Sequence, residues 1–86
     1  MSTNYGVDVA FDDYNKAIQL NRTYAPAYYN RARIHQMRRD YGSALQDYDE
    51  AIRLQPDYSD AYYNRGVLHR AMGAVEKANA AKQRDG

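Results

Sequence analysis

The chain has 86 residues and a formal net charge of +1, from 12 Lys and Arg against 11 Asp and Glu. A chain of this length forms one small domain, since it buries only about 60–65% of its unfolded surface. The absence of Cys excludes disulfides and thiolate metal sites, and no stretch reads as a membrane span or a secretory signal. We therefore expect a single cytoplasmic domain with no membrane contact.

The apolar composition limits the kind of core that the chain can form. Leu, Ile, Val and Phe together number only 12, whereas there are 13 Ala and 10 Tyr. The balanced charge argues against disorder despite the shortage of large aliphatic side chains. A core made from this composition must pack small residues under tyrosine rings whose hydroxyls stay near water or a polar partner.

The first predicted helix covers residues 7–20. Its apolar face consists of Val7, Phe11, Tyr14 and Ile18. This face is wide enough for two neighbouring helices, but the chain offers only one, the helix predicted over 26–39. We therefore expect the face to be covered by a second copy, as a homo-oligomer or a domain-swapped dimer, or by further repeats of a longer array.

The next two helices are predicted over residues 26–39 and 42–54. Pro26 suits the first turn of the second helix, and Asp40 can cap the start of the third. Pro56 ends the third helix, because proline disfavours helical geometry in the residue before it. Two further helices are predicted over 60–72 and 75–84, and no strand pattern of period two appears. The predicted fold class is all-α, with five helices.

The chain repeats itself with a period of 34 residues. Between residues 10 and 37, 13 of 28 positions are identical to the residue 34 positions later. A few matches would be expected by chance, so the segment is an internal duplication. Each unit contains two amphipathic helices joined by a short turn, which makes the repeated unit a helical hairpin.

These residues resemble the tetratricopeptide repeat (TPR) family. The features that carry the resemblance are the 34-residue period, the tract 61–66 (Ala-Tyr-Tyr-Asn-Arg-Gly), the small residues Ala32, Ala44 and Ala51, the aromatic Tyr48 and the closing Pro56. It covers residues 7 to about 78 and implies a right-handed α-solenoid of antiparallel helical hairpins, about two and a half repeats long. First helices would line a concave groove and second helices the outer surface.

The resemblance divides the single domain 1–86 into three parts. Residues 7–24 form a half repeat with a second helix only, 25–58 a full repeat, and 59–86 a repeat whose C-terminal helix is degenerate. Arg39 stands at the turn where Gly73 stands in the next repeat, so we expect a first turn that is strained or differently shaped.

Charge differs between the helix types. Residues 26–39 carry four arginines and no acid, whereas 40–55 carry four acids and one arginine. Under the family geometry, the groove is lined by Tyr29, Asn30, Arg33 and Gln36 from one repeat and Tyr63, Asn64, Val67 and Arg70 from the next. Rings, amides and guanidinium groups suit an extended acidic peptide. The alternative is a purely structural assembly module, or part of a longer scaffold, with no groove ligand and with Arg31 and Arg65 pointing into solvent.

Other chemistries are disfavoured. His35 and His69 occupy equivalent positions, but neither has a third ligand at helical spacing, so core packing is the better interpretation and no metal is expected. No Gly-x-Ser-x-Gly motif and no phosphate-binding glycine loop is present, so we expect no enzyme and no cofactor. Alternating Arg and Tyr could hold a single nucleic-acid strand, but the small net charge makes nucleic acid an unlikely partner.

Overall fold

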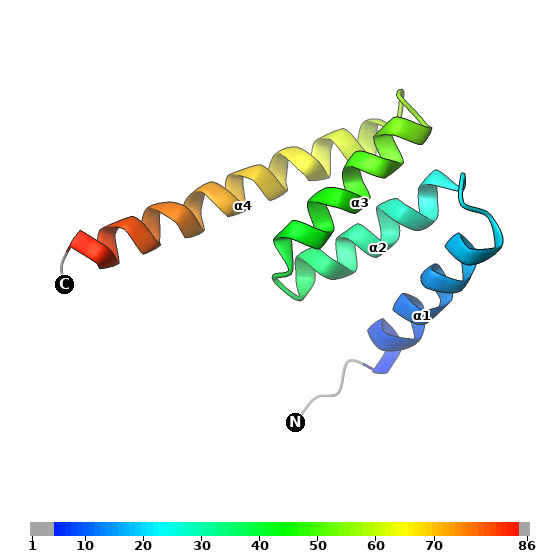
Figure 1. The fold of residues 1–86 in the computed structure, drawn as a ribbon, viewed down its shortest axis with the longest axis horizontal. Helices are drawn as coiled ribbons and strands as arrows, with labels where there is room; N and C mark the ends of the chain where they lie inside the picture. The colour runs from blue at the N-terminus through cyan, green and yellow to red at the C-terminus, as the bar shows by residue number, and fades with distance from the viewer. Residues whose placement is uncertain (1–4, 85–86) are drawn as a thin grey trace.

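The computed structural model describes residues 5–84, and the side chains of residues 5–81. This part of the chain contains four α-helices and no strand: α1 (Tyr5–Leu20), α2 (Ala25–Met37), α3 (Tyr41–Leu54) and α4 (Ser59–Arg84). α2 packs against α1 on one side and α3 on the other, and α3 packs in turn against the N-terminal half of α4 (Figure 1). The all-α fold and the stacked helical hairpins are therefore confirmed.

The first three helices begin and end within two residues of their predicted limits. Pro26 lies in the first turn of α2, where a missing backbone N–H costs nothing. The Asp40 carboxylate accepts a hydrogen bond from the Ser43 backbone N–H at 3.5 Å and caps α3. α3 ends at Leu54, two residues before Pro56, as predicted.

The prediction of five helices is wrong, because the expected break at Gly73 is absent. α4 runs without interruption from Ser59 to Arg84, and its C-terminal half extends beyond the other helices (Figure 1). The capping residue Asp40 has Ala74 as its equivalent, which cannot cap a helix and has the highest helix propensity. Gly73 has no positive φ, so the chain continues as helix where α2 turns.

The turn between α2 and α3 uses Arg39 in the left-handed region, with φ of 61°. The Asp40 N–H donates to the His35 carbonyl at 2.9 Å, and the Arg39 N–H donates to the Gln36 carbonyl at 3.0 Å. This pair of bonds is the Schellman arrangement, in which glycine is usual at the position of Arg39. The expected strain in the first turn is therefore confirmed, at a cost of about 1 kcal/mol.

The core consists of small residues beside tyrosine rings. One fully buried cluster contains Ala32, Ala44, Tyr48 and Leu68, and a second contains Ala25, Ala51 and Ala61. Alanine at these helix contacts lets the backbones approach closely, and the Tyr48 ring fills the space that remains. The Tyr29 ring lies 6.1 Å from that of Tyr48 and 5.1 Å from that of Tyr58, which extends the packing toward the start of α4.

Candidate functional site

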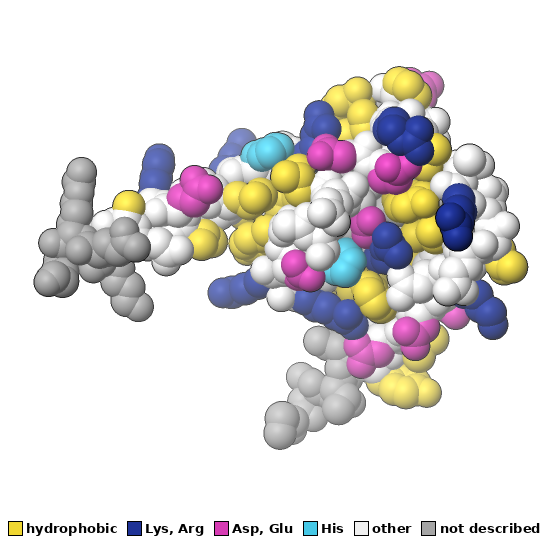
Figure 2. Space-filling view, in the orientation of Figure 1, with side chains coloured by type: hydrophobic (Ala, Val, Ile, Leu, Met, Phe, Trp, Pro, Cys, Tyr) yellow, Lys and Arg dark blue, Asp and Glu magenta, His cyan; other side chains and the backbone are white. Residues whose placement is uncertain are grey.

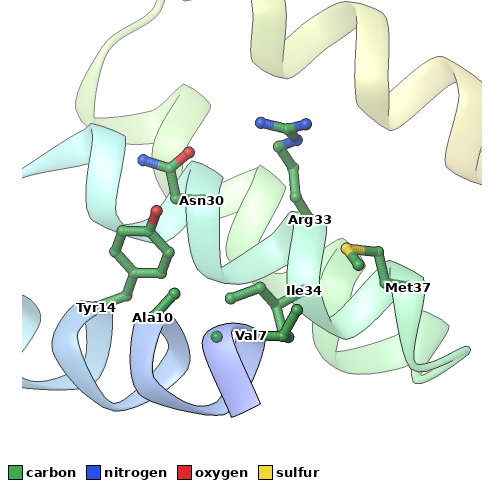
Figure 3. A pocket seen from close by; sticks show the side chains of 8 residues that line it. Val7, Ala10, Tyr14, Asn30, Arg33, Ile34 and Met37 are labelled. Atoms are coloured by element: carbon green, nitrogen blue, oxygen red, sulfur yellow. The ribbon is translucent and has the colours of Figure 1, made fainter. Parts of the chain in front are cut away.

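A pocket of about 230 Å³ lies between α1 and α2 (Figure 3). It is lined by Gly6, Val7, Ala10 and Tyr14 from α1 and by Asn30, Arg33, Ile34 and Met37 from α2. The Tyr14 ring rises from α1 toward Asn30, and Arg33 stands at the rim. The structure thus brings part of the predicted self-association face together with part of the predicted groove.

α1 has no buried residue, although its sequence repeats that of α3. The α1 residues Ala10 and Tyr14 are half-buried, whereas their equivalents in α3, Ala44 and Tyr48, are fully buried. The difference arises because α3 lies between α2 and α4, while α1 packs against α2 alone. One side of α1 is therefore an unpartnered face: it carries the residue types of the buried face of α3, but no second helix packs against it.

Phe11 shares the apolar face of Val7 and Tyr14 and packs within the chain. Its ring meets the His35 ring edge-on at 5.3 Å, and the Arg38 guanidinium lies 4.6 Å above its centroid. Of the predicted self-association residues, Val7 and Tyr14 line the pocket, Phe11 contacts α2, and Ile18 is half-buried outside the pocket.

Three of the predicted groove residues are held by contacts between helices. The Asn64 amide donates to the Tyr29 hydroxyl at 2.8 Å, and the Tyr48 hydroxyl donates to the Gln36 side-chain oxygen at 2.7 Å. Burial raises the pKa of Tyr48 to about 12, because the phenolate would lose its hydration there. These contacts join α2 to α3 and α4.

The exposed groove residues lie on α2 and the N-terminal half of α4. Tyr63 and Val67 are 66% and 39% exposed, and Arg33 and Arg70 are exposed as well. The Arg33 guanidinium lies 5.8 Å above the centroid of the Tyr29 ring. Neither arginine forms an ion pair with any residue that the structure describes.

A charged network around Arg31 was missed by the sequence reasoning. Its guanidinium donates to both carboxylate oxygens of Asp47, at 2.7 and 2.8 Å, and to the Asn15 side-chain oxygen at 3.0 Å. The hydrogen bond with Asp47 raises the pKa of Arg31, against the opposing effect of burial. The expectation that Arg31 points into solvent is wrong, and the 16-residue spacing to Asp47 was the signal that could have found the pair.

Ion pairs within the chain neutralise two of the four arginines in residues 26–39. Arg31 binds Asp47, and Arg38 binds Asp8 of α1. Arg65 of α4 binds Asp49 at 2.7 Å. The face drawn in Figure 2 accordingly shows basic and acidic side chains interspersed over the packed helices. Of the predicted groove residues, Arg33 and Arg70 are the cations that form no ion pair with any described residue.

The histidines occupy different surroundings. The His35 Nε2 and Nδ1 lie 3.6 and 3.7 Å from carboxylate oxygens of Asp47 and Asp40. His69 is exposed on α4, so the expectation of core packing is wrong for this residue. Within the described residues, no three His, Cys, Asp or Glu side chains are grouped as metal ligands. Among the described helices, none combines the length and apolar character needed to cross a membrane.

Two family models match overlapping parts of the chain. The model described as tetratricopeptide repeat matches residues 13–46, and the one described as TPR repeat matches residues 39–73. Between them they span residues 13–73, which include α2, α3, the C-terminal half of α1 and the N-terminal half of α4. No curated protein matches the sequence at a significant level.

Proposed function

Because the chain belongs to the tetratricopeptide repeat family, whose repeats form protein–protein interaction modules, we propose that it binds an extended acidic peptide on its groove face. The groove face is the exposed surface of α2 and the N-terminal half of α4. We propose further that the module associates through the unpartnered side of α1, and that it has no catalytic activity.

The observation that carries the peptide proposal is the pair of unneutralised arginines beside exposed apolar groups. Arg33 and Arg70 offer forked donors to carboxylates, while Tyr63 and Val67 provide apolar contact for the side chains between them. The stacking of Arg33 on the Tyr29 ring holds one guanidinium in place, so less conformational entropy is lost on binding.

A labelled peptide of alternating Glu and Leu tests this proposal, with the corresponding Gln and Leu peptide as the neutral probe. Fluorescence anisotropy should show preferential binding of the acidic peptide, weakened by added salt. The double variant Arg33→Glu, Arg70→Glu should reduce its affinity by about tenfold or more.

A matched control variant makes the same change in net charge on α1 and α3. The variant Lys16→Glu, Arg53→Glu alters exposed residues of α1 and α3 that lie away from the groove face. It should bind the acidic peptide about as well as the wild type. Equal loss in both double variants, or equal binding of the acidic and neutral peptides, would overturn the groove assignment.

The observation that carries association through α1 is the absence of any buried residue along this helix. Its pocket side presents Val7, Ala10 and Tyr14, which are apolar or amphipathic and lie next to one another (Figure 3). Light scattering over increasing protein concentration should show an average mass above that of the monomer. A monomeric mass throughout would contradict this part of the proposal.

A further inference from the structure

We propose that the chain assembles head to tail: the N-terminal half of α4 from one copy occupies the pocket between α1 and α2 of the next. This inference rests on the proposed association through α1 and identifies the surface that covers it. The 34-residue period shows what fills the equivalent space inside the chain.

The pocket has a filled counterpart one repeat later. The pocket residues Ala10, Tyr14 and Ile34 correspond to Ala44, Tyr48 and Leu68. Those three counterparts are fully buried in one cluster with Ala32 of α2. α2 therefore fills the space beside α3 and α4. The equivalent space one repeat earlier, beside α1 and α2, is open.

α4 carries the same docking face as α2 but leaves it uncovered. The three α2 side chains that enter the filled space are Tyr29, Ala32 and Gln36, and their counterparts in α4 are Tyr63, Gly66 and Arg70. All three counterparts are exposed, and a Cβ placed on Gly66 would meet no atom within 4 Å. The N-terminal half of α4 can thus enter the pocket of another copy as α2 enters the space beside α3 and α4. Because this contact covers Tyr63 and Arg70 of the groove face, the acidic peptide and a second copy compete for α4, and a copy binds the peptide only while its α4 is free.

The charges at the two ends complement each other. Arg31 binds Asp47 of the following helix, and the equivalent residues are Arg65 and Asp13. Arg65 donates to Asp49 through Nη1, as Arg31 donates to the equivalent residue Asn15, and the Arg65 Nε and Nη2 form no hydrogen bond with the described residues. Residue Ala81 stands 16 positions after Arg65, so α4 offers no carboxylate there. Asp13 is exposed and pairs with no cation among the described residues. Docking α4 on α1 of another copy places Arg65 beside Asp13.

The polar contacts inside the chain have equivalents at the same junction. The hydrogen bond from Asn64 to the Tyr29 hydroxyl corresponds to one from Asn30 to the Tyr63 hydroxyl. The contact of Tyr48 with Gln36 corresponds to one in which the Arg70 guanidinium donates to the Tyr14 hydroxyl.

Charge disfavours a two-fold contact in which α1 packs on α1 or α4 packs on α4. A symmetric contact between two copies of α1 would bring Asp13 near its own copy, and one between two copies of α4 would bring Arg65 near its own copy. Like charges would then face each other. A head-to-tail contact pairs opposite charges and leaves one free α1 and one free α4 at the ends, so assemblies should lengthen with concentration.

Two variants, each with one end blocked, test the arrangement. Ala10→Gln fills the pocket from α1, and Gly66→Gln adds bulk to the docking face of α4, where the monomer has free space. Each variant alone should be monomeric by sedimentation velocity with unchanged helical circular dichroism. An equimolar mixture should form a species of twice the monomer mass and nothing larger, because one compatible junction remains.

Matched substitutions that copy the neighbouring repeat serve as controls. Gly66→Ala introduces the residue found at Ala32, and Asp12→Gln introduces the residue found at Gln46 on the exposed side of the helix. Both controls should assemble at least as well as the wild type.

The outcomes separate this inference from the broader proposal. A monomeric wild type overturns both association through α1 and the head-to-tail arrangement. If the wild type assembles and the Gly66→Gln variant by itself still dimerises through α1, only the head-to-tail arrangement is overturned. A mixture of the two blocked variants that stays monomeric overturns it as well, provided that both variants retain wild-type helicity.

Discussion

Arg31 and Asp47 form a two-point ion pair between α2 and α3, with Nε donating to Oδ2 at 2.7 Å and Nη2 donating to Oδ1 at 2.8 Å. Asp47 is the buried charged residue of the core. Because Arg31 also donates to Asn15 of α1, a single side chain connects three consecutive helices. This geometry makes the pair a determinant of how the helices stack.

Removing the carboxylate of this pair should destabilise the fold strongly. Asp47→Ala leaves a partly buried guanidinium without its counterion, and we expect a loss of about 2–4 kcal/mol in the free energy of unfolding. The comparison is Asp49→Ala, which breaks the more exposed pair with Arg65 and should cost less than about 1 kcal/mol. Urea unfolding of dilute protein measures both, and equal losses would show that burial of the Arg31 pair contributes nothing.

The two equivalent turn positions should respond to opposite substitutions. Arg39→Gly should stabilise the fold by about 1 kcal/mol, because Arg39 has φ of 61°. Gly73→Ala should also stabilise, by up to about 1 kcal/mol, since Gly73 lies inside a continuous helix and its Cβ would meet no atom within 4 Å. Thermal unfolding tests both variants. Destabilisation by Gly73→Ala would indicate that a turn forms at residue 73.

Alkaline pH should weaken the fold through Tyr48. Its pKa is 10.0 in the unfolded chain and about 12 in the folded one, because burial disfavours the phenolate. The folded state thus retains a proton that the unfolded state releases, so the associated stability is complete below pH 10 and declines between pH 10 and 12. Burial raises the pKa of Tyr58 in the same direction.

The variant Tyr48→Phe isolates this effect. It loses the hydrogen bond to Gln36, so its stability at neutral pH should fall by about 1 kcal/mol. Its further loss between pH 10 and 12, followed by urea unfolding at each pH, should be smaller than that of the wild type. An equally steep alkaline decline in the variant would assign the effect to other groups.

Enlarging the equivalent alanines of α1 and α3 should have different effects in the monomer. Ala44→Leu forces three carbon atoms into a fully buried contact and should cost about 1–3 kcal/mol. Ala10→Leu extends into the open pocket and should change monomer stability by less than about 1 kcal/mol. Unfolding of dilute protein measures both. A similar cost at the two positions would mean that the space beside Ala10 is closed in solution.

Much of the fold follows from local sequence. The 34-residue period, the first-turn Pro26 and the capping Asp40 predicted the first three helices. The proline and the cap are local signals, which act within a few residues of the helix ends. The break at Gly73 was predicted from the repeat and is absent, because Ala74 lacks the capping side chain of its equivalent Asp40. The repeat thus indicated where a turn belongs, while the local residues decided that none forms.

The candidate site was predictable only in part. The sequence placed Val7 and Tyr14 on an apolar face and Asn30 and Arg33 on the groove side, but not their meeting in one pocket. Whether an arginine is free or paired depends on helices far apart in sequence. Arg31 and Arg33 looked alike in the chain, yet only Arg31 meets a buried carboxylate.

The sequence by itself determined the helical hairpin, its core of small residues packed against tyrosine rings, and its family, since these depend on spacing within one repeat. Only the tertiary structure decided which copies of the repeated positions are covered. Tyr14 and Tyr48 occupy the same place in their repeats, but Tyr48 lies between two helices and is fully buried, while Tyr14 meets one and lines an open pocket. Burial is a property of neighbours, and the neighbours differ along the stack.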